Sequence, residues 1–115
     1  MSISYKGYKE NTLTLEQGAD LTVGAPVTVN ANGAAVPAPI GAAFIGVCTA
    51  IRNGFASIQT DGYTELEYTG TAPSTGLATL VAAGSNKVKA GGDNDIALYK
   101  VVKLDTVNSI VGIIL

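Results

Sequence analysis

The most constraining stretch of this sequence runs from residue 43 to residue 70, where strand-forming residues continue around two marked turns. Asn53-Gly54 predicts a two-residue type I′ turn, because Asn and Gly adopt the required positive φ angles at little steric cost. A turn at this place makes a hairpin in which Ile51 faces Ala56. A second turn at Asp61-Gly62 then leads into a third strand.

The register predicted from this turn divides the hairpin into two faces, because side chains alternate along a strand. The face expected to line the core carries the larger apolar pairs: Ile51–Ala56, Thr49–Ile58 and Val47–Thr60. The opposite face carries smaller and more polar pairs, which suit solvent or a close neighbour: Arg52–Phe55, Ala50–Ser57, Cys48–Gln59 and Gly46–Asp61.

The composition predicts an all-β fold. Thr, Val and Ile are frequent, helix formers other than Ala are scarce, and many of the 14 glycines fall in turn pairs such as Asn32-Gly33. A chain of 115 residues fits one domain with a core of its own. We therefore expect a small β-barrel or β-sandwich of short antiparallel strands over residues 12–115, preceded by an extended N-terminal arm over residues 1–11.

Polar and apolar alternation and turn residues divide the domain into strands. The segments expected as strands, besides the hairpin, are Thr12–Leu15, Leu21–Val23, Val27–Val29, a return strand at Val36, Leu77–Ala82, an exposed edge at Lys87–Lys89, Ala97–Leu104 and Ser109–Leu115. Pro37, Pro39 and Gly41 make residues 36–42 an edge strand or a crossing loop. Residues 71–76, which include Pro73 and Ser74, form a loop without an ionisable group.

A weak internal repeat is offset by about 52 residues. Residues 24–36 and 76–88 have the same length, a turn near the middle and a Val that restarts the pairing. Each is followed by a hairpin, over residues 44–58 and 97–113. Small-residue β sequences also match by chance; if the repeat is a duplication, the fold consists of two similar β-modules, about 24–58 and 76–113.

The low charge limits the partners. Charged residues make up 14% of the chain and the net charge is −2, which leaves no basic face for nucleic acid or an anionic membrane surface. A mean hydropathy of +0.32 indicates a surface covered by small residues or buried in an assembly. No apolar run reaches membrane-spanning length and the N-terminus lacks a secretory signal, so we expect a cytosolic site of synthesis.

The sequence does not predict an enzyme or a cofactor site. The chain has no His and a single Cys, Cys48, which excludes a disulfide and a His-assisted thiol. Asp93 and Asp95 have the oxygen-rich character of a calcium loop but lack its further ligands, so a solvated turn is favoured. Glu65 and Glu67 share one face of a strand and are interpreted as a charged outer face.

The order of several motifs resembles the small decoration, or cement, proteins of tailed-phage capsids. The motifs are Gly24-Ala-Pro-Val27, Phe44-Ile-Gly-Val47, Gly54-Phe-Ala-Ser-Ile58-Gln with Asp61-Gly62, Tyr99-Lys-Val-Val-Lys-Leu-Asp105 and Ile110-Val-Gly-Ile-Ile-Leu115. This resemblance implies a protein made in the bacterial host cytoplasm that binds the outer capsid surface of the virion. Its partner would be the major capsid protein, and the family often forms homotrimers that strap neighbouring subunits together. The resemblance brings no catalytic residues.

The contact residues are inferred from exposure and chemistry. The arm is interpreted either as a frayed end or as a strap whose tyrosines dock on a neighbour. The residues expected to contact the capsid or a second subunit are Tyr5, Lys6, Tyr8 and Lys9 in the arm, and Pro37, Pro39, Pro73 and Ser74 in the loops. Two alternatives stay open: a phage tail or fibre module that binds a host glycan, and a barrel with a lumen for a small ligand.

Overall fold

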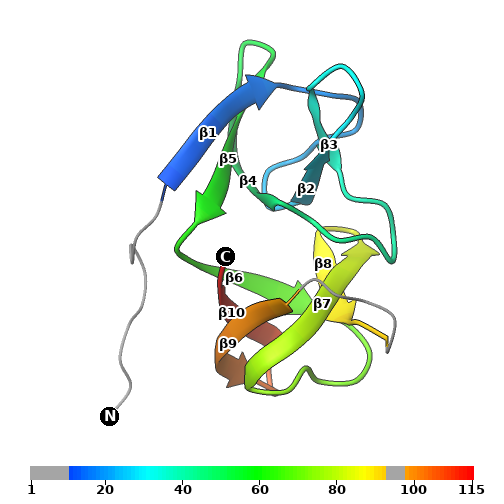
Figure 1. The fold of residues 1–115 in the computed structure, drawn as a ribbon, viewed down its shortest axis with the longest axis vertical. Coiled ribbons are helices and arrows are strands. Elements are labelled where there is room, and N and C mark those ends of the chain that lie inside the picture. Colours follow the sequence, from blue (N-terminus) through cyan, green and yellow to red (C-terminus); the bar gives the residue numbers. More distant parts are fainter. Residues whose placement is uncertain (1–10, 93–97) are drawn as a thin grey trace.

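The computed structural model describes residues 11–92 and 98–115, and this part of the chain is all-β, as expected (Figure 1). The strands are β1 (Asn11–Glu16), β2 (Pro26–Val29), β3 (Ala35–Pro37), β4 (Gly46–Arg52), β5 (Phe55–Asp61), β6 (Tyr63–Tyr68), β7 (Gly76–Gly84), β8 (Lys87–Ala90), β9 (Leu98–Asp105) and β10 (Ile110–Ile114). The predicted arm lies outside the described residues, except for Asn11, which begins β1.

The strands form two sheets, one from each half of the sequence. The first half makes an open sheet in the order β1-β5-β4-β2-β3, and the second half makes a closed five-stranded barrel, β10-β6-β8-β7-β9. The pairings are antiparallel except that between β6 and β8. Figure 1 shows the open sheet stacked along the longest axis on the barrel.

The two halves pair their strands in the same order. In each half the first strand pairs with the fifth, the fifth with the fourth, the fourth with the second and the second with the third. The barrel is closed by the parallel β6–β8 contact, and the matching place in the first half has a single parallel bridge, Gln17 to Ala35. The structure therefore adds a shared pairing pattern to the predicted repeat, while duplication itself stays a prediction.

The register of the β4–β5 hairpin agrees with the prediction only near its turn. Ala50 pairs with Ser57 as expected, but the register shifts at Thr49, so that Cys48 pairs with Ile58. The predicted pairs Thr49–Ile58, Val47–Thr60, Cys48–Gln59 and Gly46–Asp61 are therefore wrong. An extra residue in one strand forms a β-bulge and reverses the facing of every residue beyond it. Cys48 is accordingly buried in the core and Thr49 is exposed.

Two other strand predictions were wrong. Residues 21–23 form no strand, although Leu21 is buried as an apolar anchor between β1 and β2. The predicted edge strand at Lys87–Lys89 is β8, which pairs with both β6 and β7 inside the closed barrel. By contrast, β3 with Pro37 is an edge of the first sheet, as a strand that contains Pro should be. Ala97 lies outside the described residues.

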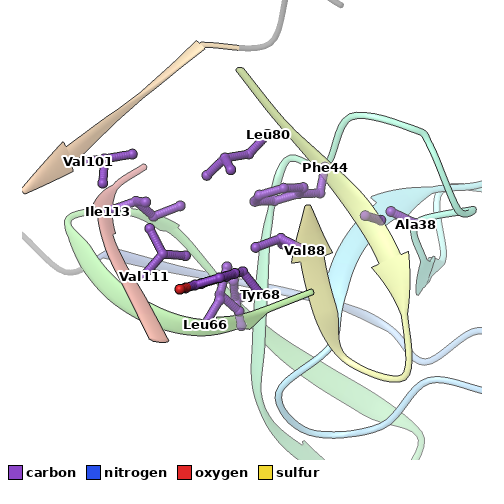
Figure 2. Close-up of a cluster of buried hydrophobic side chains, with 11 residues drawn as sticks. Ala38, Phe44, Leu66, Tyr68, Leu80, Val88, Val101, Val111 and Ile113 are labelled. Carbon is purple, nitrogen blue, oxygen red and sulfur yellow. The ribbon is translucent and has the colours of Figure 1, made fainter. Parts of the chain in front are cut away.

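Each half has its own hydrophobic cluster, and corresponding strand positions fill the two. The barrel cluster contains Leu80, Val88, Val101, Val111 and Ile113, shown in part in Figure 2. The residues at the corresponding strand positions of the first half are, in the same order, Val27, Ala35, Cys48, Ala56 and Ile58. Four of the five are smaller than their counterparts, so the first sheet encloses a smaller core.

Side chains of the first half complete the core of the barrel. Ala38, Phe44 and Val47 belong to the barrel cluster, and Figure 2 shows the Phe44 ring between Leu80 and Val88. The Phe44 ring stacks on Tyr99 with 4.8 Å between centroids, and the Tyr99 hydroxyl donates a 2.7 Å hydrogen bond to the Phe44 carbonyl. The two halves are therefore packed together by a shared core.

Candidate interaction surfaces

The predicted contact residues that the structure describes lie on two separate surfaces. Tyr5, Lys6, Tyr8 and Lys9 lie outside the described residues. The two predicted loops lie at opposite ends of β7. Residues 71–75 lead into its start at Gly76, whereas residues 41–42 bond to Ala82 near its end. The six residue steps from Gly76 to Ala82 span about 20 Å, so the two loops belong to separate surfaces.

The loop that contains Pro73 and Ser74 borders a hollow of about 440 Å³ beside β7. Pro73 is buried and fixes the loop, whereas Ser74 is exposed. Two apolar side chains in the lining point outward, Leu77 with 67% and Leu98 with 58% of its surface exposed. Sequence reasoning missed both leucines. Alternation along β7 was the available signal, because Leu77 and the buried Leu80 fall on opposite faces.

The residues around Pro37 line a seam between the two halves. This hollow of about 300 Å³ is bordered by Pro26 and Pro37 on one side and by residues 84–86 on the other. The Asn86 amide crosses the seam, donating to the Val23 carbonyl at 3.3 Å, and its side-chain oxygen accepts from the Thr22 hydroxyl at 3.1 Å. The seam is therefore an internal junction, and the apolar residues exposed beside it include the predicted Pro39 and also Val23 and Ile40, which are 55% and 71% exposed.

A third hollow lies on the outer face of the β4–β5 hairpin. Its volume is about 590 Å³, and its lining includes Thr14, Ala50 and Ser57 as small floor residues, with Arg52 and Phe55 beside them. Phe55 is 52% exposed although it is a large aromatic residue. The sequence analysis placed the pairs Arg52–Phe55 and Ala50–Ser57 on a small and polar face that suits a close neighbour, and the outward position of these four residues is confirmed.

Several ionisable groups of β6 pair with one another or with lysines of β8 and β9. The Tyr63 hydroxyl donates to Glu65 at 2.7 Å, and the Lys103 ammonium lies 3.3 Å from the same carboxylate. Glu67 lies 3.9 Å from Lys87. Burial raises the pKa of the Cys48 thiol, which disfavours the reactive thiolate. Within residues 11–92 and 98–115, no cluster of metal-ligating side chains was found.

No helix in the described part of the chain could cross a membrane. Comparisons with protein-family models, with curated proteins and with solved structures found no match to this chain.

Proposed function

We propose that this chain is a structural virion protein that decorates the outer surface of an assembled phage capsid. It binds neighbouring major capsid protein subunits, as a homotrimer, and holds them together. The sequence motifs support this proposal through their resemblance to decoration proteins. The observation that carries it is the pair of exposed leucines, Leu77 and Leu98, beside a hollow on the outside of the barrel. Exposed apolar side chains around a hollow are typical of a protein-docking surface.

Stabilisation of the capsid would follow from linkage. A protein that binds the assembled lattice but not its dissociated subunits lowers the free energy of the lattice by its binding free energy. Many copies on one shell multiply the effect. This role needs a rigid domain with an adhesive surface and needs no reactive group.

The test is binding to expanded, undecorated capsid shells. The wild-type protein should bind saturably and raise the melting temperature of the shell. Full burial of a Leu side chain contributes about 1.5–3 kcal/mol, so burying the exposed part of each leucine should contribute about 1–2 kcal/mol. At 1.4 kcal/mol per tenfold change, Leu77→Ser with Leu98→Ser should weaken binding about 100-fold.

The matched control is Val107→Ser, because Val107 is 89% exposed in the β9–β10 turn, away from the hollow. All variants should keep the melting temperature of the free protein, since these side chains contribute little to its core. Wild-type protein that fails to bind related shells would overturn the proposed function. Binding that survives both leucine changes would overturn the proposed contact surface.

A further inference from the structure

The Asn53-Gly54 turn has no part in the proposed docking surface, but its residues can react with each other. The turn joins β4 to β5 at the end of the open sheet that is remote from the barrel (Figure 1). Both residues are exposed. An Asn that precedes Gly can cyclise, because the backbone nitrogen of Gly reaches the side-chain amide carbon of Asn without a Cβ atom of its own in the way. The fold decides whether that nitrogen is free to do so.

The peptide unit between Asn53 and Gly54 is free to rotate. Neither the Asn53 carbonyl nor the Gly54 amide has a hydrogen-bond partner among the residues that the structure describes. The turn is held through the next peptide unit, whose Gly54 carbonyl accepts a 2.8 Å hydrogen bond from the Gln17 amide. A flip of the 53–54 unit converts a type I′ turn into a type II′ turn, and both types join antiparallel strands. The flip brings the Gly54 nitrogen to the side of the Asn53 Cβ atom, as ring closure requires.

The other Asn-Gly pair of the chain, Asn32-Gly33, is held in place. The Gly33 amide donates a 3.0 Å hydrogen bond to the Asn30 carbonyl. The Asn30 side-chain oxygen accepts from the amides of Asn32 and Ala34, at 2.9 Å and 3.0 Å. Rotation of the 32–33 unit would break the first of these bonds, and the other two restrain the loop on either side. Since Asn32 and Gly33 are also exposed, hydrogen bonding and not burial distinguishes the two pairs.

Two further asparagines of the described chain have engaged side chains. The Asn86 amide bonds across the seam, and the Asn108 amide donates to the Asp105 carboxylate at 2.9 Å. Each is followed by a residue with a side chain, which hinders attack by the backbone nitrogen. The structure therefore favours reaction at Asn53 over these positions.

We propose that Asn53 is a site of spontaneous modification, at which the folded chain converts asparagine into aspartate and isoaspartate. The Gly54 nitrogen, deprotonated by hydroxide, attacks the Asn53 Cγ and closes a succinimide ring. Nδ2 takes a proton from water and leaves as ammonia, which regenerates the hydroxide. Water then opens the ring, at Cγ to give aspartate or at the backbone carbonyl carbon to give isoaspartate. In sum, an amide and a water become a carboxylate and ammonium, and no atom changes oxidation state.

The modification would change the rim of the outer hollow. Asn53 borders this hollow of about 590 Å³ beside Arg52 and Phe55. Either product adds one negative charge to a chain whose net charge is −2. Isoaspartate also lengthens the backbone of the turn by one atom, so it should loosen the β4–β5 hairpin, whose turn type depends on loop length. The reaction depends on the hairpin alone and is independent of capsid binding.

The test incubates the full chain in mildly alkaline buffer, both folded and in denaturant. Chymotrypsin cleaves after Phe44 and Phe55, which isolates Asn53 in the peptide 45–55, apart from Asn32. Mass spectrometry then measures the conversion of amide to carboxylate at each site. Freeing the Gly33 amide costs a hydrogen bond, so Asn53 should react about tenfold faster than Asn32 in the folded protein. In denaturant the two rates should become similar, because each site is then an unstructured Asn-Gly pair.

Two measurements identify the cause and the pathway. Asn30→Ala removes the two side-chain hydrogen bonds that restrain Asn32, so it should speed the reaction at Asn32 and leave the rate at Asn53 unchanged. Hydrolysis of the ring in H₂¹⁸O should place one ¹⁸O atom in each new carboxylate, and labelling by an isoaspartyl methyltransferase should detect the isoaspartate product.

Three results would overturn the proposal. The first is a rate at Asn32 that equals or exceeds the rate at Asn53 in the folded protein. The second is an Asn53 that stays intact in the folded protein but reacts in denaturant, which would show that the turn protects it. The third is a preference for Asn53 that persists unchanged in denaturant, which would show that the fold does not cause it. Circular dichroism checks that the wild type stays folded, and this comparison needs no variant.

Discussion

Phe44 offers a direct test of how the two halves are held together. Its side chain comes from the segment between β3 and β4, is 4% exposed and packs in the barrel core against Tyr99. Replacing it with Ala would leave a cavity between the halves and remove a stacked aromatic pair. The substitution should therefore weaken the packing between the two halves and not the packing of one sheet alone.

The expected loss of unfolding free energy is large. Phe→Ala at a buried site costs about 3–5 kcal/mol. For a chain of 115 residues, the unfolding entropy is such that each 1 kcal/mol lost from the free energy of unfolding lowers the melting temperature by about 4 °C. Phe44→Ala should therefore lower the melting temperature by about 12–20 °C. Phe44→Leu, which keeps most of the volume, should cost about 1.5 kcal/mol or less.

The chain supplies a matched control, because its second phenylalanine, Phe55, is half-exposed on the outer face of the hairpin. Phe55→Ala should cost about 1 kcal/mol or less, since little buried surface is lost. Thermal unfolding followed by circular dichroism or calorimetry measures all three variants. Equal losses for Phe44→Ala and Phe55→Ala, or separate transitions already present in the wild type, would refute the reasoning that a shared core joins the halves.

Two further predictions concern a glycine of β4 and a carboxylate at the β9–β10 turn. Gly46→Ala should destabilise the fold by about 1–3 kcal/mol in denaturant titrations, because the added Cβ would collide with the Gln59 carbonyl and approach Ile58 Cγ2 to 2.8 Å; a neutral effect would show that β4 can move away from β5. Hydrogen bonds from the Asn108 side chain and from the Asn108 and Val107 amides lower the pKa of Asp105. The stabilisation from this carboxylate is present above its ordinary pKa of 3.8 and is lost as pH falls through its lower folded value. Asp105→Asn should therefore reduce stability more at pH 7 than at pH 2, and an equal loss at both values would contradict the assignment.

Local sequence signals predicted most of the strand positions along the chain. Asn53 and Gly54 have φ angles of 53° and 81°, as a type I′ turn requires, and the adjoining pairs follow from it. The bulge at Thr49 could not be predicted, because no Gly or Pro marks it. A single misplaced residue was enough to assign Cys48 to the wrong face.

Long-range contacts explain the remaining errors. The closure of the barrel depends on two parallel pairs between β6 and β8, and no local pattern distinguishes β8 from an exposed edge with two lysines. Phe44 was predicted as the first residue of the hairpin, whereas β4 begins two residues later at Gly46, and the position of Phe44 in the core of the other half depends on how the halves pack. The candidate surfaces were predictable in part, since Ser74 borders a hollow, whereas the exposure of Leu98 required the finished barrel.

The junction at Asp61 and Gly62 brings three parts of the chain to one place. Asn11 pairs with Asp61, and the Leu115 amide donates a 2.9 Å hydrogen bond to the Gly62 carbonyl. The start of β1 and the end of β10 therefore lie beside the point where one half passes into the other. A short linker from residue 115 to residue 11, combined with a cut at residue 62, would produce a circular permutant in which the barrel precedes the open sheet while every strand keeps its neighbours.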